Sequence, residues 1–356
     1  MLDRLTLERR AVVPPALAAA SFAGSLAIGL LLSALVLVLA GVPATLLAEE
    51  LVVQVFFTAD GLAQTVTTAI PLVLVGLCTA MAFRVGFWNI GIEGQLWLGA
   101  IAATALSVHD VGPPGLRLPF MLLASALAGA VWIGIPLVLK LRLGVSEIVV
   151  SLLLSNVAFL LLQHVLFGAL RDPGANFPVS PPFGLEERLG QLGWGRTHFG
   201  LAMALLAAVL TAILVRATRP GFYAKVVGAG PDAARTAGLP VVATVTGFVL
   251  LSGAFAGLAG GIIVTGTEYR LTQFVGLNTT FSGIVVATLA RLDPLGVVIA
   301  AFFVAGLYVA GGTLKVFYGV SEGIVVLIQG ILLLTLLDGQ FAATYRVAGV
   351  HAAARA

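Results

Sequence analysis

The sequence has few charged residues and few of the side chains that build metal centres or disulfides. Only 10% of its 356 residues are Asp, Glu, Lys or Arg, well below the roughly 25% of soluble globular domains. Its single cysteine, Cys78, excludes an internal disulfide, and its four histidines lie too far apart for a zinc-ligand spacing. Water is therefore not the main solvent of this chain, and zinc-binding or disulfide-stapled classes are excluded.

The sequence also lacks a phosphate-binding loop. Its three lysines, Lys140, Lys225 and Lys315, precede leucine, valine and valine, so no Gly-x-x-x-x-Gly-Lys-Ser/Thr motif occurs. An enzyme is disfavoured as well, because no nucleophile and base stand together in sequence. The net charge of +3 is explained by basic cytoplasmic loops, so we do not expect nucleic-acid binding.

Long hydrophobic runs dominate what is present. Hydrophobic residues make up 60% of the chain, the mean hydropathy is +1.09, and a spanning helix needs roughly 20 apolar residues. We therefore predict an all-α integral membrane protein of about ten transmembrane helices, some short or broken, forming a single domain over 1–356. The candidate spans are 16–40, 62–83, 90–108, 119–140, 146–168, 199–216, 241–265, 279–290, 295–313 and 321–338. The first exceeds the core of a signal peptide, so we expect it to stay as an anchor.

Charge placement predicts the orientation of these spans. Most of the 19 Lys and Arg residues fall on one side if the spans alternate, and the positive-inside rule makes that side cytoplasmic. The ends, 1–15 and 339–356, and the loop 216–241 are then cytoplasmic, and the loop 169–198 is periplasmic. Within 216–241, Pro231, Asp232, Arg235 and Gly238 are placed to start, complement and end a short helix over 231–237. So short a helix needs support, which we expect from another protein.

Three segments carry a family resemblance. The loop from Arg219 to Leu239 resembles the coupling loop of ABC importer permeases in the branched-chain amino acid, ribose and nucleoside group. Phe83–Ala100 and Gly144–Asn156 resemble the pattern of its nucleoside and simple-sugar branch. The resemblance extends over about residues 15–340. The chain has Val-Ser-Glu where the family usually has Val-Asn-Glu, and Leu-Ser-Asn where it has Leu-Asn, departures that bear on the substrate.

The resemblance implies a permease subunit that carries a nucleoside, with a simple sugar such as ribose as the alternative. It implies three partners besides membrane lipid: a second related permease, a cytoplasmic ATPase that holds ATP and Mg, and an extracytoplasmic substrate-binding lipoprotein. No cofactor is expected in this chain. The residues expected to couple it to the ATPase are Gly228, Pro231, Asp232, Ala234, Arg235 and Gly238. A secondary transporter or channel is the rival class, disfavoured because no lysine or arginine lies in mid-span.

The expected translocation path follows the polar groups in the spans. Glu93 and Glu147 are costly there unless paired or hydrated. The other candidates are Trp88, Asn89, Gln95, Asn156 and Gln329. The residues alone leave a structural role open: Glu147 would cap its own helix, and Glu93 would bind the backbone of a broken helix.

Two further patterns concern packing and symmetry. Gly253, Gly257 and Gly261 recur every four residues in an apolar span, which predicts close helix packing. The stretch Gly144–Val150 recurs with one inserted glycine as Gly319–Val326. An inverted repeat would place such copies in spans of opposite direction, and chance similarity is the alternative.

Overall fold

The structure is a computed structural model that describes residues 5–10, 13–47, 49–113, 115–276 and 279–349. The chain divides into two compact units. One consists of Met1–Thr58 with Leu307–Ala356, and the other of Ala59–Gly306. The division on the C-terminal side falls inside one helix, α12.

Ten apolar helices lie where the hydrophobic runs predict them. They are α1 (Pro15–Leu39), α3 (Ala59–Arg84), α4 (Ile92–Val108), α5 (Arg117–Leu143), α6 (Glu147–Phe167), α7 (Gly200–Ala217), α10 (Val241–Ile263), α11 (Thr279–Leu289), α12 (Pro294–Tyr318) and α13 (Glu322–Thr344). Among the described residues, eight helices are long and apolar enough to cross a membrane, and α4 and α11 are shorter. The predicted all-α membrane fold is confirmed.

The first unit is built on two long helices and their connections. Helix α1 packs against α13, and strand β1 (Leu5–Arg9) pairs antiparallel with β2 (Tyr345–Gly349). Short helical segments follow α1, namely η2 (Ala44–Leu46), η3 (Glu49–Val53) and α2 (Gln54–Phe56). The hydroxyl of Tyr318 donates to Glu50 at 2.9 Å. Helix α13 continues to Thr344, beyond residue 338 where the predicted span ends, and β2 follows it directly.

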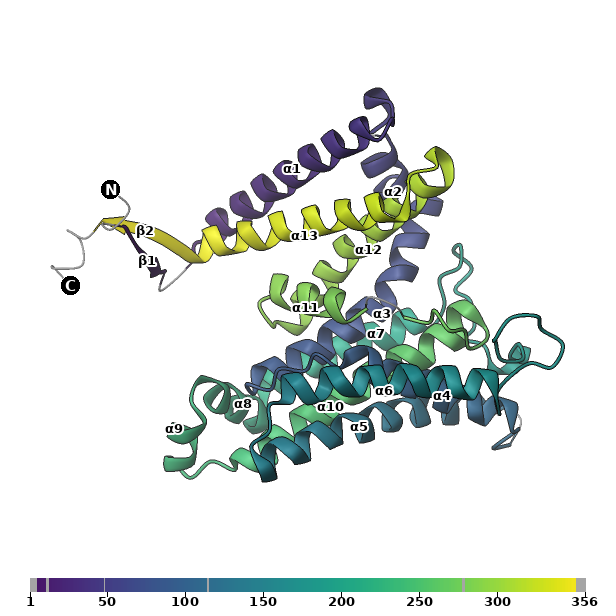
Figure 1. The fold of residues 1–356 in the computed structure, drawn as a ribbon. Coiled ribbons are helices and arrows are strands. Elements are labelled where there is room, and N and C mark those ends of the chain that lie inside the picture. The colour runs from purple at the N-terminus through teal and green to yellow at the C-terminus, as the bar shows by residue number, and fades with distance from the viewer. Residues whose placement is uncertain (1–4, 11–12, 48, 114, 277–278, 350–356) are drawn as a thin grey trace. The chain divides into compact units, whose positions relative to one another are not determined.

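The second unit is centred on α10, which packs against α3, α4 and α5 (Figure 1). The four glycines in the second half of α10, from Gly253 to Gly261, lie where these helices meet. A methyl group on Gly257 would collide with the carbonyl of Ser125 and with Gly129 of α5, and one on Gly253 with the carbonyl of Gly129. Gly261 lies against the side chain of Ser125. The missing side chains therefore let backbones touch, as in other membrane helix pairs.

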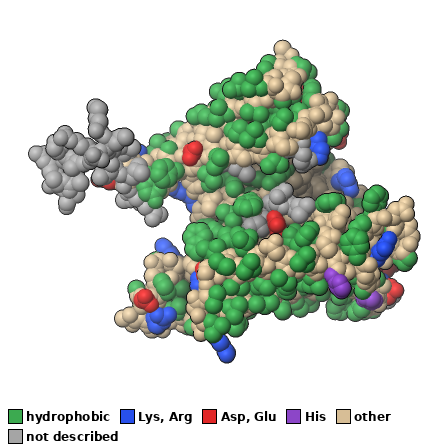
Figure 2. All heavy atoms as spheres, viewed as in Figure 1, with side chains coloured by type: hydrophobic (Ala, Val, Ile, Leu, Met, Phe, Trp, Pro, Cys, Tyr) green, Lys and Arg blue, Asp and Glu red, His purple; other side chains and the backbone are tan. Residues whose placement is uncertain are grey.

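Burial separates central helices from peripheral ones. In the apolar windows of α3 and α10, 72% of residues are buried, against 22% in those of α1 and α6. On the face shown in Figure 2, hydrophobic side chains cover the helices and charged side chains are few. Exposed apolar surface of this extent is stable in lipid and not in water.

The connections hold more structure than the sequence predicts. The segment 168–199 between α6 and α7 contains the turn η4 (Leu185–Glu187) and pairs through Val179 with Thr272. The segment after α7 forms two helices, α8 (Arg219–Ala229) and α9 (Pro231–Thr236), where one short helix over 231–237 was predicted. Helix α10 ends in a π-helical turn, η5 (Val264–Glu268).

The two copies of the repeated stretch have the same local backbone. Gly144 and Gly319 are both left-handed, with φ of +67° and +62°. Ser146 and Ser321 are extended and precede α6 and α13. Each copy therefore ends a turn and starts a spanning helix.

Candidate functional site

The break between α3 and α4 is held by a buried pair of amides. Asn89 Nδ2 donates to Gln95 Oε1 at 3.1 Å, and Gln95 Nε2 donates back to Asn89 Oδ1 at 2.8 Å. Asn89 also accepts from the Gly91 amide and donates to Ser252 Oγ of α10 at 3.3 Å. The two side chains are 0% and 1% exposed. Because each amide is satisfied inside the protein, neither faces a solute in this conformation.

Helix α6 holds the same break from its other side. Glu147, in its first turn, accepts from the backbone amide of Trp88 at 3.2 Å and forms an ion pair with Lys140 of α5. Ser151 Oγ accepts from the amide of Ile90 at 3.2 Å. Lys140 also donates to the carbonyl of Gly86. The negative charge of Glu147 is therefore matched by a cation and fixes an irregular backbone between three helices.

The aromatic side chains near this break divide into buried and exposed members. Trp97 is buried and its indole Nε1 donates to the carbonyl of Val275 at 2.7 Å. Trp88 is 52% exposed, and its ring lies 4.5 Å from the ring of Phe83. Glu93 is half-buried in the first turn of α4. Its charge complements the positive end of the helix dipole there.

The remaining polar candidates lie elsewhere. Asn156 is exposed on α6 and donates to the Leu152 carbonyl of its own helix at 3.1 Å. Gln329 belongs to α13 in the other unit, and its side chain lies outside the described residues. The structure thus brings Asn89, Gln95 and Glu147 to one break, leaves Trp88 open beside it, and places Asn156 on an outer helix face.

The two helices α8 and α9 form an elbow on the ends of other helices. Thr218 caps α8 by accepting from the amide of Gly221 at 3.4 Å. A methyl group on Gly228 would collide with the carbonyl of Arg84 at the end of α3. Gly230 lies between α8 and α9. The small residues therefore let α8 lie directly on the backbone of α3.

The predicted coupling residues of α9 differ in exposure. Ala234 is fully buried within this chain, whereas Ala233 and Ala237 are exposed. Asp232 and Arg235, both exposed, form an ion pair at 2.7 Å. Pro231 is the first residue of the helix, and Gly238 follows it with φ of +74°.

A strained turn lies at the same end of the unit. Arg291 and Leu292, between α11 and α12, have φ of +53° and +60°. Arg84 Nη2 donates to the Leu292 carbonyl, and Arg216 of α7 pairs with Asp293 at 2.5 Å. Burial would raise the pKa of Asp293, but the hydrogen bond from Arg216 lowers it below its usual value. The ends of α3 and α7 therefore both hold the turn before α12.

A further polar cluster, not foreseen from the sequence, fastens the segment 168–199. Glu187 is buried, accepts from Ser107 Oγ at 2.6 Å and pairs with Arg117 at 2.6 Å. Burial acts to raise the pKa of Glu187, but hydrogen bonds from Ser107 and Arg117 lower it overall. Burial lowers the pKa of His198 to about 4. Among the described residues no group of His, Cys, Asp or Glu could hold a metal ion.

Spanning helices, an irregular break held by buried polar groups, and a helical elbow on the helix ends define a membrane permease. The chain belongs to the family described as branched-chain amino acid transport system, permease component, which it matches over residues 61–337. It is an ABC transporter permease and a multi-pass protein of the inner membrane.

Three relatives carry names that describe their cargo. The chain is 35% identical to the glucose ABC transporter permease protein TsgB13 of Haloferax volcanii, over 83% of this chain and 80% of that one. It is 33% identical to the guanosine ABC transporter permease protein NupP of Bacillus subtilis, over 76% of this chain and 79% of that one. It is 29% identical to the nucleoside ABC transporter permease protein NupB of Lactococcus lactis, over 77% of this chain and 78% of that one. The predicted permease group is confirmed, and these three relatives are sugar and nucleoside permeases by name.

Proposed function

We propose that this permease carries a nucleoside into the cell as the non-catalytic membrane subunit of an ATP-driven importer. The observation that carries the choice of solute is the exposed Trp88 ring beside Phe83, at a helix break fastened by buried polar groups. Exposed aromatic faces suit the stacking of a base. Two of the three relatives described above carry guanosine or nucleosides by name.

The proposed path runs along the exposed polar groups and not through the buried amide pair. Its candidates in the second unit are Trp88, Glu93 and Asn156. Asn156 supports this path because an exposed amide on a spanning helix is unfavourable against lipid. We infer that the face of α6 with Asn156 lies toward the second permease and the solute. The path is then supported by side chains that lie behind its surface, namely Asn89, Gln95 and Glu147.

The elbow of α8 and α9 is the proposed contact with a cytoplasmic ATPase. The family implies an ATPase and a substrate-binding protein as partners in the complex. ATP and Mg would be bound by that ATPase, and no cofactor by this chain. The pairing of β1 with β2 fits an even number of crossings, because it keeps the two chain ends on one side of the membrane; that this side is the cytoplasmic one is part of the proposal. Movement of α9 would pass through Gly228 and Arg84 to the turn before α12.

A simple sugar is the second candidate, favoured by the 35% identity to a glucose permease. Carboxylate and amide groups serve sugar hydroxyls as well as ribose hydroxyls. The test is a panel of nucleosides, free bases, ribose and glucose offered to the substrate-binding partner by calorimetry, followed by uptake competition in cells. Preferential binding of nucleosides, with competition by nucleosides alone, is expected. Preferential binding of glucose or ribose would overturn the nucleoside assignment and leave the permease assignment intact.

A further inference from the structure

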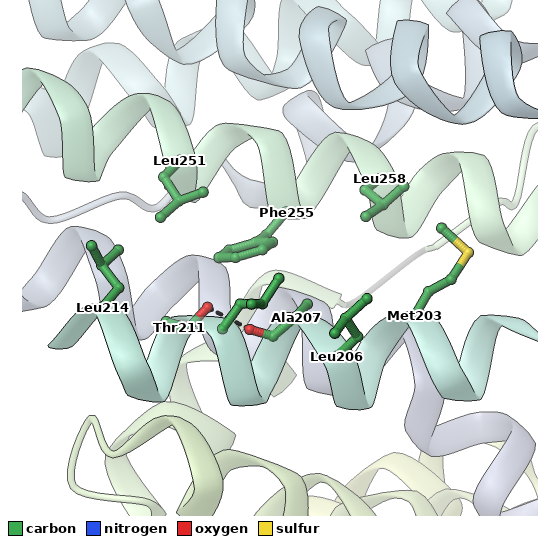
Figure 3. A pocket seen from close by; sticks show the side chains of 9 residues that line it. Met203, Leu206, Ala207, Thr211, Leu214, Leu251, Phe255 and Leu258 are labelled. Carbon is green, nitrogen blue, oxygen red and sulfur yellow. Dashed lines mark hydrogen bonds between the residues drawn. The ribbon is translucent and has the colours of Figure 1, made fainter. Parts of the chain in front are cut away.

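The groove that Figure 3 shows, between α7 and α10, does not suit a polar solute. Apolar side chains of both helices line it, among them Leu214, Leu251 and Phe255. The hydroxyl of Thr211 is the polar side-chain group in the lining, and it donates to the Ala207 carbonyl of its own helix at 2.6 Å. A nucleoside needs hydrogen-bonding partners as well as apolar contact, and this groove supplies apolar contact alone.

A second irregular segment, residues 269–276, follows α10 in the same unit. The helical turn η5 ends at Glu268, and Tyr269 then has a left-handed backbone, with φ of +57°. The amide of Phe183 donates to the carbonyl of Tyr269 at 2.8 Å. The start of this segment is therefore fastened to the connection 168–199.

The other end of this segment reaches the middle of the spanning helices. The indole Nε1 of Trp97 donates to the carbonyl of Val275 at 2.7 Å. From Trp97 to Val108, where α4 ends, the helix rises about 16 Å. That distance is roughly half of the 30 Å thickness of the hydrocarbon, and the ion pair of Arg117 with Glu187 marks the same end of the unit. Val275 therefore lies near mid-depth.

Two side chains of this segment present an amide and an aromatic ring beside Val275. Gln273 is half-buried, and among the described residues its side-chain amide has no hydrogen-bond partner. Phe274 is 66% exposed. Backbone that is not helical occurs at membrane depth only where it is buried in protein or lines an aqueous cavity. The exposed side of this segment therefore faces an aqueous path and not lipid.

Helices α4 and α6 run side by side in the same direction next to this segment. Gly94 of α4 lies against Ser155 of α6. About one turn further along both helices, the ring of Trp97 lies 5.4 Å from the ring of Phe159. The two helices therefore keep the same register from one turn to the next.

This register places two of the path candidates at one level. Glu93 precedes Trp97 by one turn of α4, and Asn156 precedes Phe159 by about one turn of α6. Residues three or four apart share a helix face, so both polar groups lie on the side of the aromatic pair. Trp97 is also the residue that holds Val275. The second irregular segment therefore adjoins the face that carries Glu93 and Asn156.

We infer that Gln273 and Phe274 contact the solute and select its base. The ring of Phe274 stacks on the base, and the amide of Gln273 pairs with the hydrogen-bonding edge of the base. Aromatic rings and side-chain amides are the groups with which proteins commonly hold bases. The inference rests on the proposed nucleoside function and adds a second contact region to the path.

Thiol labelling of the assembled, reconstituted transporter tests whether this segment faces the path. Cys78 is fully buried, so an added cysteine is the reactive one. A charged methanethiosulfonate reagent should label Phe274→Cys, because the reactive thiolate forms in water, and should not label Val209→Cys on the exposed surface of α7. The solute that the wild type accumulates, supplied with binding protein and ATP, should slow labelling of Phe274→Cys at least about twofold, in proportion to occupancy. Absent labelling, or labelling that the solute does not slow, would overturn the inference.

The relative uptake of guanosine and adenosine tests the contact with the base. Gln273→Glu keeps the shape of the side chain and replaces its donor by an acceptor. Guanine presents two adjacent donors on its pairing edge, whereas adenine presents one. With the binding protein saturated, the ratio of guanosine to adenosine uptake rates should therefore rise at least about fivefold. A purely structural role of Gln273 would leave this ratio unchanged.

Substitutions of Phe274 test the stacking. Phe274→Leu should lower the uptake of both nucleosides about fivefold or more, and Phe274→Trp should restore it. Phe167→Leu, which removes an exposed ring from α6, is the control and should transport normally. If the wild type accumulates nucleosides, normal rates in Phe274→Leu and an unchanged ratio in Gln273→Glu would refute the inference and leave the proposed function standing. A wild type that accumulates sugar alone would refute the proposed function, and the base contacts with it.

Discussion

Asn89 and Gln95 hold each other through two amide hydrogen bonds, at 3.1 and 2.8 Å, with both side chains fully buried. Asn89 lies in the break between α3 and α4, and Gln95 lies in the first turns of α4, so the pair ties the irregular backbone to the helix that follows it. Ser252 of α10 joins the pair through Asn89. The break is thus tied to the central helix of the unit.

The amide pair predicts a stability defect without a change in solute affinity. Gln95→Leu leaves part of the Asn89 amide unsatisfied and should lower the free energy of unfolding by about 1–3 kcal/mol. Asn156→Leu, on the exposed face of α6, should leave stability unchanged and reduce uptake. Thermal unfolding in detergent measures the stability of each variant, and uptake at matched membrane abundance measures its transport. Unchanged stability in Gln95→Leu would contradict this account of the pair.

The packing of α10 gives a comparison within one helix. Gly257→Ala places a methyl group against Ser125 and Gly129 and should destabilise the protein by about 1–3 kcal/mol. Gly247→Ala, in the same helix, has open space around the new methyl group and should be neutral or stabilising by up to about 1 kcal/mol. Thermal unfolding of the two purified variants shows which of them is the less stable. The reverse order would mean that α10 packs differently.

His198 predicts a pH dependence of stability. Its Nδ1 accepts from the Gly200 amide, and burial lowers its pKa from 6.5 to about 4. As pH falls below 6.5, the unfolded chain takes up a proton that the folded protein does not, so the free energy of unfolding decreases until about pH 4. The total loss is up to about 3 kcal/mol. The free energy of unfolding, measured from pH 7.5 to 5, should change less steeply with pH in His198→Gln than in the wild type. Equal slopes would show that His198 does not cause the pH dependence.

The exposure of each residue in α9 decides which substitution can test the contact with the ATPase. Ala233→Trp changes an exposed residue of α9, whereas a bulky residue at the buried Ala234 would disturb this chain itself. We expect Ala233→Trp to reduce uptake about tenfold or more with unchanged thermal stability, as misfit at an interface centre does. Val209→Trp, on the outward face of α7, serves as the control for a bulky exposed ring. Normal uptake in Ala233→Trp would remove α9 from the ATPase contact.

The sequence predicts the spans well because hydropathy over twenty residues is a strong and local signal. Helix α8 was missed because Arg219-Pro220-Gly221 reads as a helix breaker. In the structure Thr218 caps this start and Pro220 lies in the first turn, where a missing amide costs nothing. A proline two residues after a threonine is thus a usable signal for a helix start.

The partners of buried charges could not be read from the sequence. Lys140 and Glu147 are close in the chain, yet their pairing depends on the left-handed Gly144 that folds α6 back beside α5. Arg117 and Glu187 are 70 residues apart, and nothing local links them. Whether a polar residue lines a path or supports it is likewise decided by tertiary packing, as the burial of Asn89 and Gln95 illustrates.

The central claim is that this permease moves a nucleoside at the expense of ATP hydrolysed by a partner. The direct measurement is uptake of radiolabelled guanosine and glucose into proteoliposomes that contain this permease, its second permease and its ATPase, with the substrate-binding protein outside and ATP inside. We predict ATP-dependent accumulation of guanosine that excess unlabelled nucleoside abolishes and glucose does not. Accumulation that is independent of ATP, or that favours glucose, would contradict the account.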